Sequence, residues 1–208
     1  MIAIVDYGLG NLGSVLKGFR HAGAEVVFTS DPTTLRAADA LVLPGDGAFG
    51  ATMAEIRSRG LDRELRAAAE RGTPLLGICI GMQVLFEESE EHGQHQGLGL
   101  LPGRVRRFDH GLVVPHMGWN QLAFARPHPL FDGLAPGSHV YFVHSYYCDA
   151  PDEVTLARAD YGRLFAAVVG RGNVLGVQFH PEKSQAVGLR MVGNFVRAFA
   201  AGALRRTA

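Results

Sequence analysis

The sequence predicts an α/β fold, in which a central, mostly parallel sheet is flanked by helices and extended by antiparallel strands in the second half. In residues 1–80, continuous runs of Val, Ile and Leu alternate with segments of helical periodicity, a pattern typical of parallel strands covered on both faces. From about residue 104, extended segments follow one another with short turns. The 208 residues, 47% of them hydrophobic, suit one large domain, so we expect a single domain over residues 1–208.

The elements of the parallel half follow from its apolar runs and from the breaks between them. Short aliphatic and β-branched runs predict strands at 2–5, 25–28, 40–45 and 74–78. Two segments with apolar residues at helical spacing, each ending in glycine, predict helices at 11–23 and 60–72.

The second half contains shorter extended segments and ends in a helix. Its pattern predicts strands at 104–108, 112–115, 121–125 and 140–147. Two further strands, 164–169 and 174–179, flank the sequence GRGN, which predicts a hairpin. The segment 185–202 has a helical period and is expected to pack back on the sheet.

Charge and cysteine content exclude several classes of function. Lys and Arg together number 20 and so do Asp and Glu, which gives no electrostatic reason to expect nucleic acid or an anionic membrane as a partner. No apolar run approaches the ~18 residues of a membrane span, and the start MIAIVDYG reads as a strand rather than a signal peptide. Two cysteines, Cys79 and Cys148, show no metal-ligand spacing. We therefore expect a cytoplasmic protein without a metal.

A glycine-rich segment, GLGNLG at 8–13, matches the dinucleotide-binding pattern G-x-G-x-x-G, with Asp31 at the distance of a ribose-binding carboxylate. The alternative is a strand-to-helix turn in which Asn11 caps the helix. Pro32 follows Asp31 directly, which favours a turn or a helix cap at that position.

The segment GICIG at 77–81 indicates a catalytic cysteine. A reactive residue between small residues, at the end of a strand and before a helix, is the arrangement of a nucleophile elbow. We expect a helix over GMQVLFEE, 81–88, with its N-terminus facing the Cys79 sulfur and favouring the thiolate. The alternative is a buried structural cysteine at a strand end.

The segment VQFHPEKS supplies a general base and a group to orient it. His180 and Glu182 lie two residues apart after an apolar strand, so Glu182 can accept from one imidazole nitrogen while the other faces Cys79. Backbone N–H groups of Gly47, in LPGDG, and of Ile80 would then bind the oxyanion. His92 and His95 lie in a polar loop, where solvation is the simpler interpretation than metal binding.

These motifs, PGDG, GICIGMQ and FHPEKS, in this order and spacing, resemble those of the class I (triad) glutamine amidotransferases. DYGLGNLGS, PHMGWN (115–120) and YFVHSYY (141–147) make the chain similar, within that class, to the glutaminase subunits of imidazole glycerol phosphate synthases of histidine biosynthesis. The resemblance covers nearly the whole chain. It also implies that the glycine-rich start belongs to the family pattern and binds no dinucleotide.

The resemblance implies a Cys79, His180 and Glu182 triad that hydrolyses L-glutamine without a cofactor. It places Gln83, Glu91, Gly47, Ser145 and Tyr146 in the glutamine pocket. It further implies a heterodimer with a cyclase subunit, which is a (β/α)8 barrel that receives ammonia through a channel. Trp119 and Asn120 are expected to face this partner.

Two residues depart from the family pattern. Asp46 stands in the oxyanion turn where an apolar residue is expected, so its carboxylate should point outward or toward the partner. Ile80 replaces the usual Leu after the nucleophile.

Three other functions remain open at this point. The chain resembles, less closely, other class I glutaminases that serve anthranilate, pyridoxal phosphate or purine synthesis. A stand-alone cysteine hydrolase of γ-glutamyl amides would use the same triad without a partner. A non-catalytic nucleotide-binding module would use the glycine-rich turn and would not need Cys79.

Overall fold

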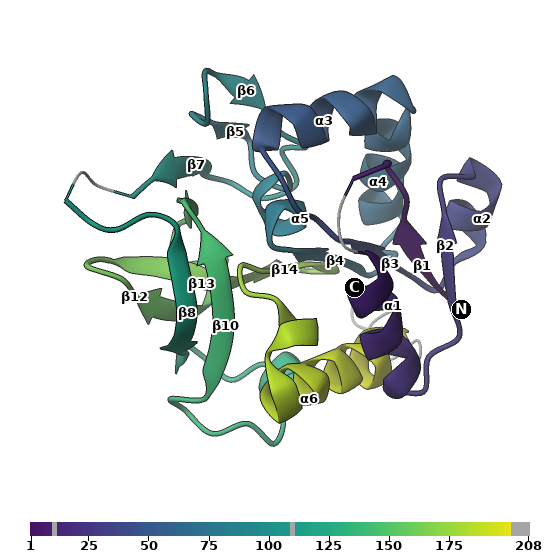
Figure 1. Ribbon diagram of the computed structural model, residues 1–208. Helices are drawn as coiled ribbons and strands as arrows, with labels where there is room; N and C mark the ends of the chain where they lie inside the picture. Colours follow the sequence, from purple (N-terminus) through teal and green to yellow (C-terminus); the bar gives the residue numbers. More distant parts are fainter. Residues whose placement is uncertain (10–11, 109–110, 201–208) are drawn as a thin grey trace.

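The computed structural model describes residues 1–9, 12–108 and 111–200 (Figure 1). Its helices are α1 Leu12–His21, α2 Pro32–Ala37, α3 Phe49–Ser58, α4 Leu61–Glu70, α5 Ile80–Gln83 and α6 Gln185–Phe195, with 3-10 turns η1 Pro129–Phe131 and η2 Pro181–Lys183 and the π-helical η3 Val196–Ala200. Its strands are β1 Ile2–Val5, β2 Val26–Thr29, β3 Ala40–Leu43, β4 Leu75–Ile78, β5 Glu88–Ser89, β6 His95–Gln96, β7 Arg104–Arg107, β8 His116–Gln121, β9 Ala123–Phe124, β10 His139–His144, β11 Tyr146–Asp149, β12 Thr155–Asp160, β13 Leu164–Arg171 and β14 Val174–Val177.

One large sheet runs through the molecule in the order β2-β1-β3-β4-β14-β13-β11-β7-β5-β6, with β12 and β9 attached beside β13. The strands from β2 to β14 are parallel, and β13 and β11 continue the sheet in the antiparallel sense. A separate antiparallel pair, β8 and β10, lies beside this sheet (Figure 1). The predicted fold class is therefore confirmed, and so is the hairpin at GRGN, where β13 turns into β14.

The parallel part is apolar on both faces because helices cover both. Along β1, Ile2 and Ile4 pack in one cluster with residues of α1 and α6, whereas Ala3 and Val5 pack in the other with residues of α2, α3 and α4. This alternation is the period of two expected of a strand buried on both sides. The predicted return of the C-terminal helix is confirmed by the buried Phe195, which contacts Phe19 of α1 edge to face.

Asp31 caps a helix. Its carboxylate accepts hydrogen bonds from the backbone N–H groups of Thr33 and Thr34 at 3.3 and 2.9 Å, at the start of α2. The helix-cap interpretation of Asp31 is thus confirmed. The predicted Asn11 cap lies outside the described residues.

The predicted helix over 81–88 is wrong beyond its first turn, because α5 ends at Gln83. The backbone carbonyls that would continue it are taken by the loop that returns past them: Val84 O accepts from Leu98 N, and Leu85 O accepts from Leu100 N, both at 2.8 Å. A tertiary contact thus ends the helix after one turn, and the dipole argument for the Cys79 thiolate loses its basis.

Other differences concern which elements form. The strand predicted at 112–115 is absent from the described residues of that stretch, and β8 begins at His116 after Pro115, a residue without a backbone donor. The helices α2 and α3 and the strand β12 were not predicted. Among the described residues no helix has the length and apolar character needed to cross a bilayer.

Candidate functional site

Cys79 stands on a strained turn between β4 and α5. Its backbone has φ 55° and ψ −114°, a conformation that few non-glycine residues adopt. Glycines on either side allow the turn to pack tightly: a Cβ on Gly81 would overlap the Leu43 carbonyl of β3, and one on Gly77 would lie 2.6 Å from the Gly81 carbonyl carbon. The elbow predicted from GICIG is present, with the thiol at the carboxyl edge of the sheet.

His180 and Glu182 reach the same edge from the neighbouring strand β14. The His180 Nδ1 atom lies 2.8 Å from Glu182 Oε1, and both side chains are buried. The pair forms in the 3-10 turn η2 rather than by strand alternation. The backbone is held there by the Ser184 hydroxyl, which donates to His180 O at 2.7 Å and accepts from Tyr141 N at 2.9 Å.

The charge state of His180 depends on its two partners. Burial lowers its pKa, but hydrogen bonds to the Cys79 sulfur and to Glu182, together with the charges of both groups, raise the pKa to about 10. An imidazolium beside the sulfur favours the thiolate, which is the nucleophilic form of cysteine. The three side chains therefore form a Cys–His–Glu arrangement suited to nucleophilic attack and to protonation of a leaving group.

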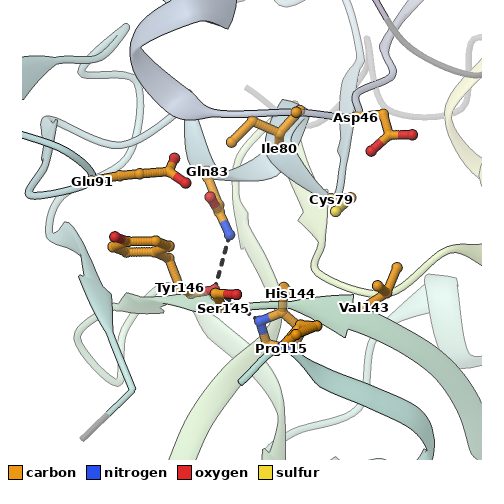
Figure 2. Close-up of a pocket in the computed structure, with 11 residues that line it drawn as sticks. Asp46, Cys79, Ile80, Gln83, Glu91, Pro115, Val143, His144, Ser145 and Tyr146 are labelled. Atoms are coloured by element: carbon orange, nitrogen blue, oxygen red, sulfur yellow. Dashed lines mark hydrogen bonds between the residues drawn. The ribbon is translucent and has the colours of Figure 1, made fainter. Parts of the chain in front are cut away.

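A cavity of about 230 Å³ opens beside Cys79 (Figure 2). It is smaller than the roughly 300–1,000 Å³ of pockets for drug-sized ligands, as suits an amino acid. All the residues predicted for the glutamine pocket line it together with Cys79: Gly47, Ile80, Gln83, Glu91, Ser145 and Tyr146. Asp46, Pro115, Val143 and His144 complete the lining.

The two ends of the cavity differ. In Figure 2, Cys79 and Asp46 lie at one end and Glu91 at the other. The Glu91 carboxylate also accepts from Phe49 N at 2.6 Å, so it caps α3 while one side faces the cavity. A carboxylate at that end could hold the α-ammonium of an amino acid whose side chain extends toward the sulfur.

The turn that supplies Gly47 is anchored by Tyr7, which follows β1 in the chain. The Tyr7 hydroxyl donates to Pro44 O at 2.6 Å, and burial, followed by the charges of Cys79 and Asp46, raises the pKa of Tyr7. Gly47 has φ 114°, which L side chains rarely adopt. Asp46 is exposed and also lines the cavity, and the outward or partner-facing direction of its carboxylate stays a prediction.

Sequence reasoning missed two buried polar residues of the site, Gln178 and His144. Gln178 is fully buried, with its Nε2 atom 3.9 Å from Cys79 Sγ and its Oε1 atom 3.0 Å from Gln83 Nε2. His144 donates from Nδ1 to Tyr146 O at 2.8 Å. Gln178 stands two positions before His180, a spacing that marks a shared face at a strand end and could have revealed it.

His144 forms a buried pair with His116. His116 Nδ1 lies 3.0 Å from His144 Nε2, and Asn120 Nδ2 lies 3.2 Å from His116 Nε2. Burial lowers the pKa of His116 to about 4. Burial, opposed by the Tyr146 carbonyl and assisted by the charges of His116 and His180, lowers that of His144 to about 3. Both rings are thus neutral at physiological pH.

This pair makes the folded chain sensitive to acid. Both histidines titrate near 6.5 when unfolded, so below pH 6.5 the unfolded chain binds more protons and stability falls as the pH drops toward 4. Each histidine contributes a slope that approaches ~1.4 kcal/mol per pH unit to the pH dependence of the free energy of unfolding. Urea unfolding between pH 7 and 5 should therefore show a shallower pH dependence in His116→Gln than in the unmodified chain. The same replacement at the exposed His139 is the control, and equal slopes in both variants would contradict the assignment.

Trp119 and Asn120 lie on opposite faces of β8. The Trp119 side chain is 48% exposed and packs edge to face on Tyr141 of β10, whereas the Asn120 amide points inward to His116 and donates to Asp160 O at 2.8 Å. Successive side chains of a strand alternate, so Met117, and not Asn120, shares the exposed face with Trp119. The Asn120 amide thus points away from the face that carries Trp119, and contact of either residue with a partner stays a prediction.

The other sulfur and histidine side chains that the structure describes do not form a second centre. Among residues 1–9, 12–108 and 111–200, no group of three or more His, Cys, Asp or Glu side chains could hold a metal ion. Cys148 is buried in β11, and burial raises the pKa of its thiol well above the ordinary value. His92 is exposed and His95 is half-buried on β6.

Sequence comparisons place the chain among known proteins of one family. The family model "Glutamine amidotransferase class-I" matches residues 3–199. The imidazole glycerol phosphate synthase subunit HisH of Syntrophotalea carbinolica is 54% identical over 203 residues, which cover 94% of this chain and 98% of that protein. Its counterpart in Moorella thermoacetica is 52% identical over 195 residues, which cover 93% of each chain.

Solved structures agree at the level of the fold. A glutamine amidotransferase crystal structure superposes with a TM-score of 0.76 at 24% identity, covering 97% of this chain and 100% of the other. The structure of PurLQS from Thermotoga maritima gives 0.73 at 20% identity, covering 96% of this chain and 97% of the other. Together with the sequence matches, these findings establish that the chain belongs to the class I glutamine amidotransferase family, in the branch of imidazole glycerol phosphate synthase subunit HisH.

Proposed function

We propose that this chain is the glutaminase subunit of an imidazole glycerol phosphate synthase and hydrolyses L-glutamine to glutamate and ammonia for histidine biosynthesis. One observation carries the proposal: the strained Cys79 lies between the His180–Glu182 pair and a cavity lined by every residue expected to hold glutamine. The free thiols of Cys79 and Cys148 fit the reducing compartment of the cytoplasm.

The reaction uses these groups in two steps. The Cys79 thiolate attacks the side-chain amide carbon, and backbone N–H groups of Gly47 and Ile80 bind the developing oxyanion. His180, held by Glu182, gives its proton to the leaving ammonia, and a γ-glutamyl thioester remains. His180 then takes a proton from water, the hydroxide adds to the thioester carbon, and glutamate leaves as the thiolate re-forms.

The partner is proposed to be a cyclase subunit with a (β/α)8 barrel. The exposed side of the β8–β10 pair carries Met117 and Trp119 opposite Val143 and Tyr141, which we call the β8–β10 apolar face. Val143 also lines the cavity beside Cys79. A partner seated on this face would cover the mouth from which ammonia leaves and would keep it from being protonated in bulk water.

The decisive experiment is ammonia release from glutamine by the purified chain, alone and with the cyclase plus its nucleotide substrate. We expect little release by the isolated chain and a large rise in the complex, because the ammonia has a use only there. Full activity without the cyclase would instead favour a stand-alone cysteine amidase, and stimulation by the synthase of another pathway would favour a different class I glutaminase.

Trp119 is expected to contribute strongly to association. A tryptophan that is exposed in the free protein and becomes buried at the centre of an interface commonly contributes about 2 kcal/mol or more to the free energy of binding. Trp119→Ala should therefore raise the Kd for the cyclase by roughly 30-fold. Isothermal titration calorimetry measures this directly. Phe28→Ala, which removes a 40% exposed ring from β2 at the other edge of the sheet, is the matched control. Equal Kd values for both variants would show that the partner binds elsewhere.

A further inference from the structure

We propose that Gln178 is a positioning residue for the Cys79 sulfur: it donates one amide N–H to Sγ, in an orientation set by a buried hydrogen-bond network. This inference rests on the proposed role of Cys79 as the nucleophile. Sequence motifs alone assign Gln178 no part in the reaction. Its place in the fold, directly after β14 and beside the elbow, brings its amide to the sulfur.

The Gln178 side chain is enclosed between two groups of the site. Gln178 is fully buried. Its amide nitrogen, Nε2, lies 3.9 Å from Cys79 Sγ, and its amide oxygen, Oε1, lies 3.0 Å from Gln83 Nε2. Gln83 is itself buried and donates from the same Nε2 atom to Tyr146 O at 3.0 Å (Figure 2). A buried amide in such a place must satisfy both of its ends with protein groups.

One backbone carbonyl, Tyr146 O, sets the direction of each hydrogen bond that links Gln83, Gln178 and Cys79. Tyr146 O can only accept, so Gln83 must present its NH₂ group there. The Gln83 nitrogen can only donate, so Gln178 must present its oxygen to it. Only the Gln178 NH₂ group is then left to face Cys79. The opposite orientation would place two donors against each other and an oxygen against the sulfur, at the cost of buried unpaired groups.

A second arm of the network holds the same carbonyl. His144 donates from Nδ1 to Tyr146 O, and because its ring is neutral, Nε2 accepts from His116 Nδ1. His116 Nε2 in turn accepts from the Asn120 amide. The Tyr146 carbonyl thus receives two donors, from His144 and from Gln83, which hold the peptide in place. The orientation of Gln178 is set before any substrate binds.

An N–H donor at this position stabilises negative charge on sulfur and keeps the thiolate aimed at the cavity. It cannot take part in proton transfer, because an amide neither gains nor loses a proton at neutral pH. His180 therefore remains the proton carrier, and Gln178 acts through the position and charge of Sγ. Gln83 also lines the cavity, so glutamine that binds there contacts the same network.

The test compares Gln178→Met and Gln178→Glu with the unmodified chain. Met keeps the volume without a donor, and Glu keeps the oxygen that accepts from Gln83 but replaces the N–H. Two measurements are made: the rate of Cys79 alkylation by iodoacetamide from pH 5 to 10, with mass spectrometry to identify the site, and kcat and KM for glutamine in the assembled enzyme. Gln96→Met, at an exposed position on β6, is the matched control.

We expect Gln178→Met to alkylate about ten-fold more slowly at pH 7, with the pH of half-maximal rate moved up by about one unit. We expect kcat to fall in proportion, with KM nearly constant. In Gln178→Glu, the pH of half-maximal rate should move up further, because an ionised carboxylate repels the thiolate. The Gln96→Met control should match the unmodified chain in both measurements.

Two outcomes are distinguishable. If both Gln178 variants keep the alkylation profile of the unmodified chain and lose only thermal stability, Gln178 is a packing residue and the inference is overturned. If Cys79→Ala retains glutaminase activity, the proposed function itself fails, whatever Gln178 does.

Discussion

Replacing Cys79 with serine should abolish glutamine hydrolysis in the assembled enzyme, with a fall in kcat of at least about 1,000-fold. In the proposed reaction the sulfur is the nucleophile, and it is also one of the partners that raise the His180 pKa. A serine hydroxyl in its place carries no negative charge at neutral pH, so His180 loses that partner and no thioester forms. Ammonia release in the presence of the cyclase and its substrate measures the loss, and calorimetry shows whether glutamine still binds.

Cys148→Ala is the control for this experiment. It removes the other thiol of the chain, which is buried in β11 and does not line the cavity. Its activity should stay close to that of the unmodified enzyme. Comparable losses in both variants would mean that general destabilisation, and not removal of a nucleophile, explains the effect of Cys79→Ser.

Gly81→Ala should be strongly destabilising, costing at least about 3 kcal/mol of the free energy of unfolding. A Cβ on Gly81 would overlap the Leu43 carbonyl oxygen and lie 2.8 Å from its carbon, and both belong to the backbone of β3. A strand in the middle of the parallel sheet cannot move away without breaking its pairing with β1 and β4. Chemical denaturation of the purified variant measures the change.

Gly13→Ala is the matched control for the same added methyl group. Gly13 lies in α1, and a Cβ built there meets nothing within 4 Å. Alanine is the better helix former, so this variant should gain about 0.5–1 kcal/mol. The prediction is refuted if the two variants unfold at the same denaturant concentration.

The sequence-based predictions agree best with the structure around Cys79, where the proposed reaction takes place. The apolar runs predicted β1, β3 and β4 closely because a strand buried on both faces needs continuous aliphatic residues. The glycines around Cys79 predicted a tight turn because nothing larger fits against β3. His180 and Glu182 were found together because a two-residue separation keeps their contact local.

The predictions failed where a distant segment decided the outcome. The helix after Cys79 stops at Gln83 because residues from 98 onward bond to carbonyls that it would have used. Asn120 and Trp119 point to opposite faces because they are neighbours on β8, whereas tertiary packing decides which of the two faces stays exposed. The end of the helix and the choice of the exposed face are not visible in a local pattern, since each depends on which part of the chain packs there.

The sequence by itself determined the class of the fold, the elbow and the His180–Glu182 pair, because periodicity, glycine positions and short spacings are local properties. Only the tertiary structure decided which polar side chains converge on the sulfur. Gln83 and Gln178 are 95 positions apart, and Gln178 and Cys79 are 99 apart, yet their hydrogen bonds form one buried chain. A buried amide acquires its orientation from the donors and acceptors that the fold brings to it, and these become known only when distant segments are packed together.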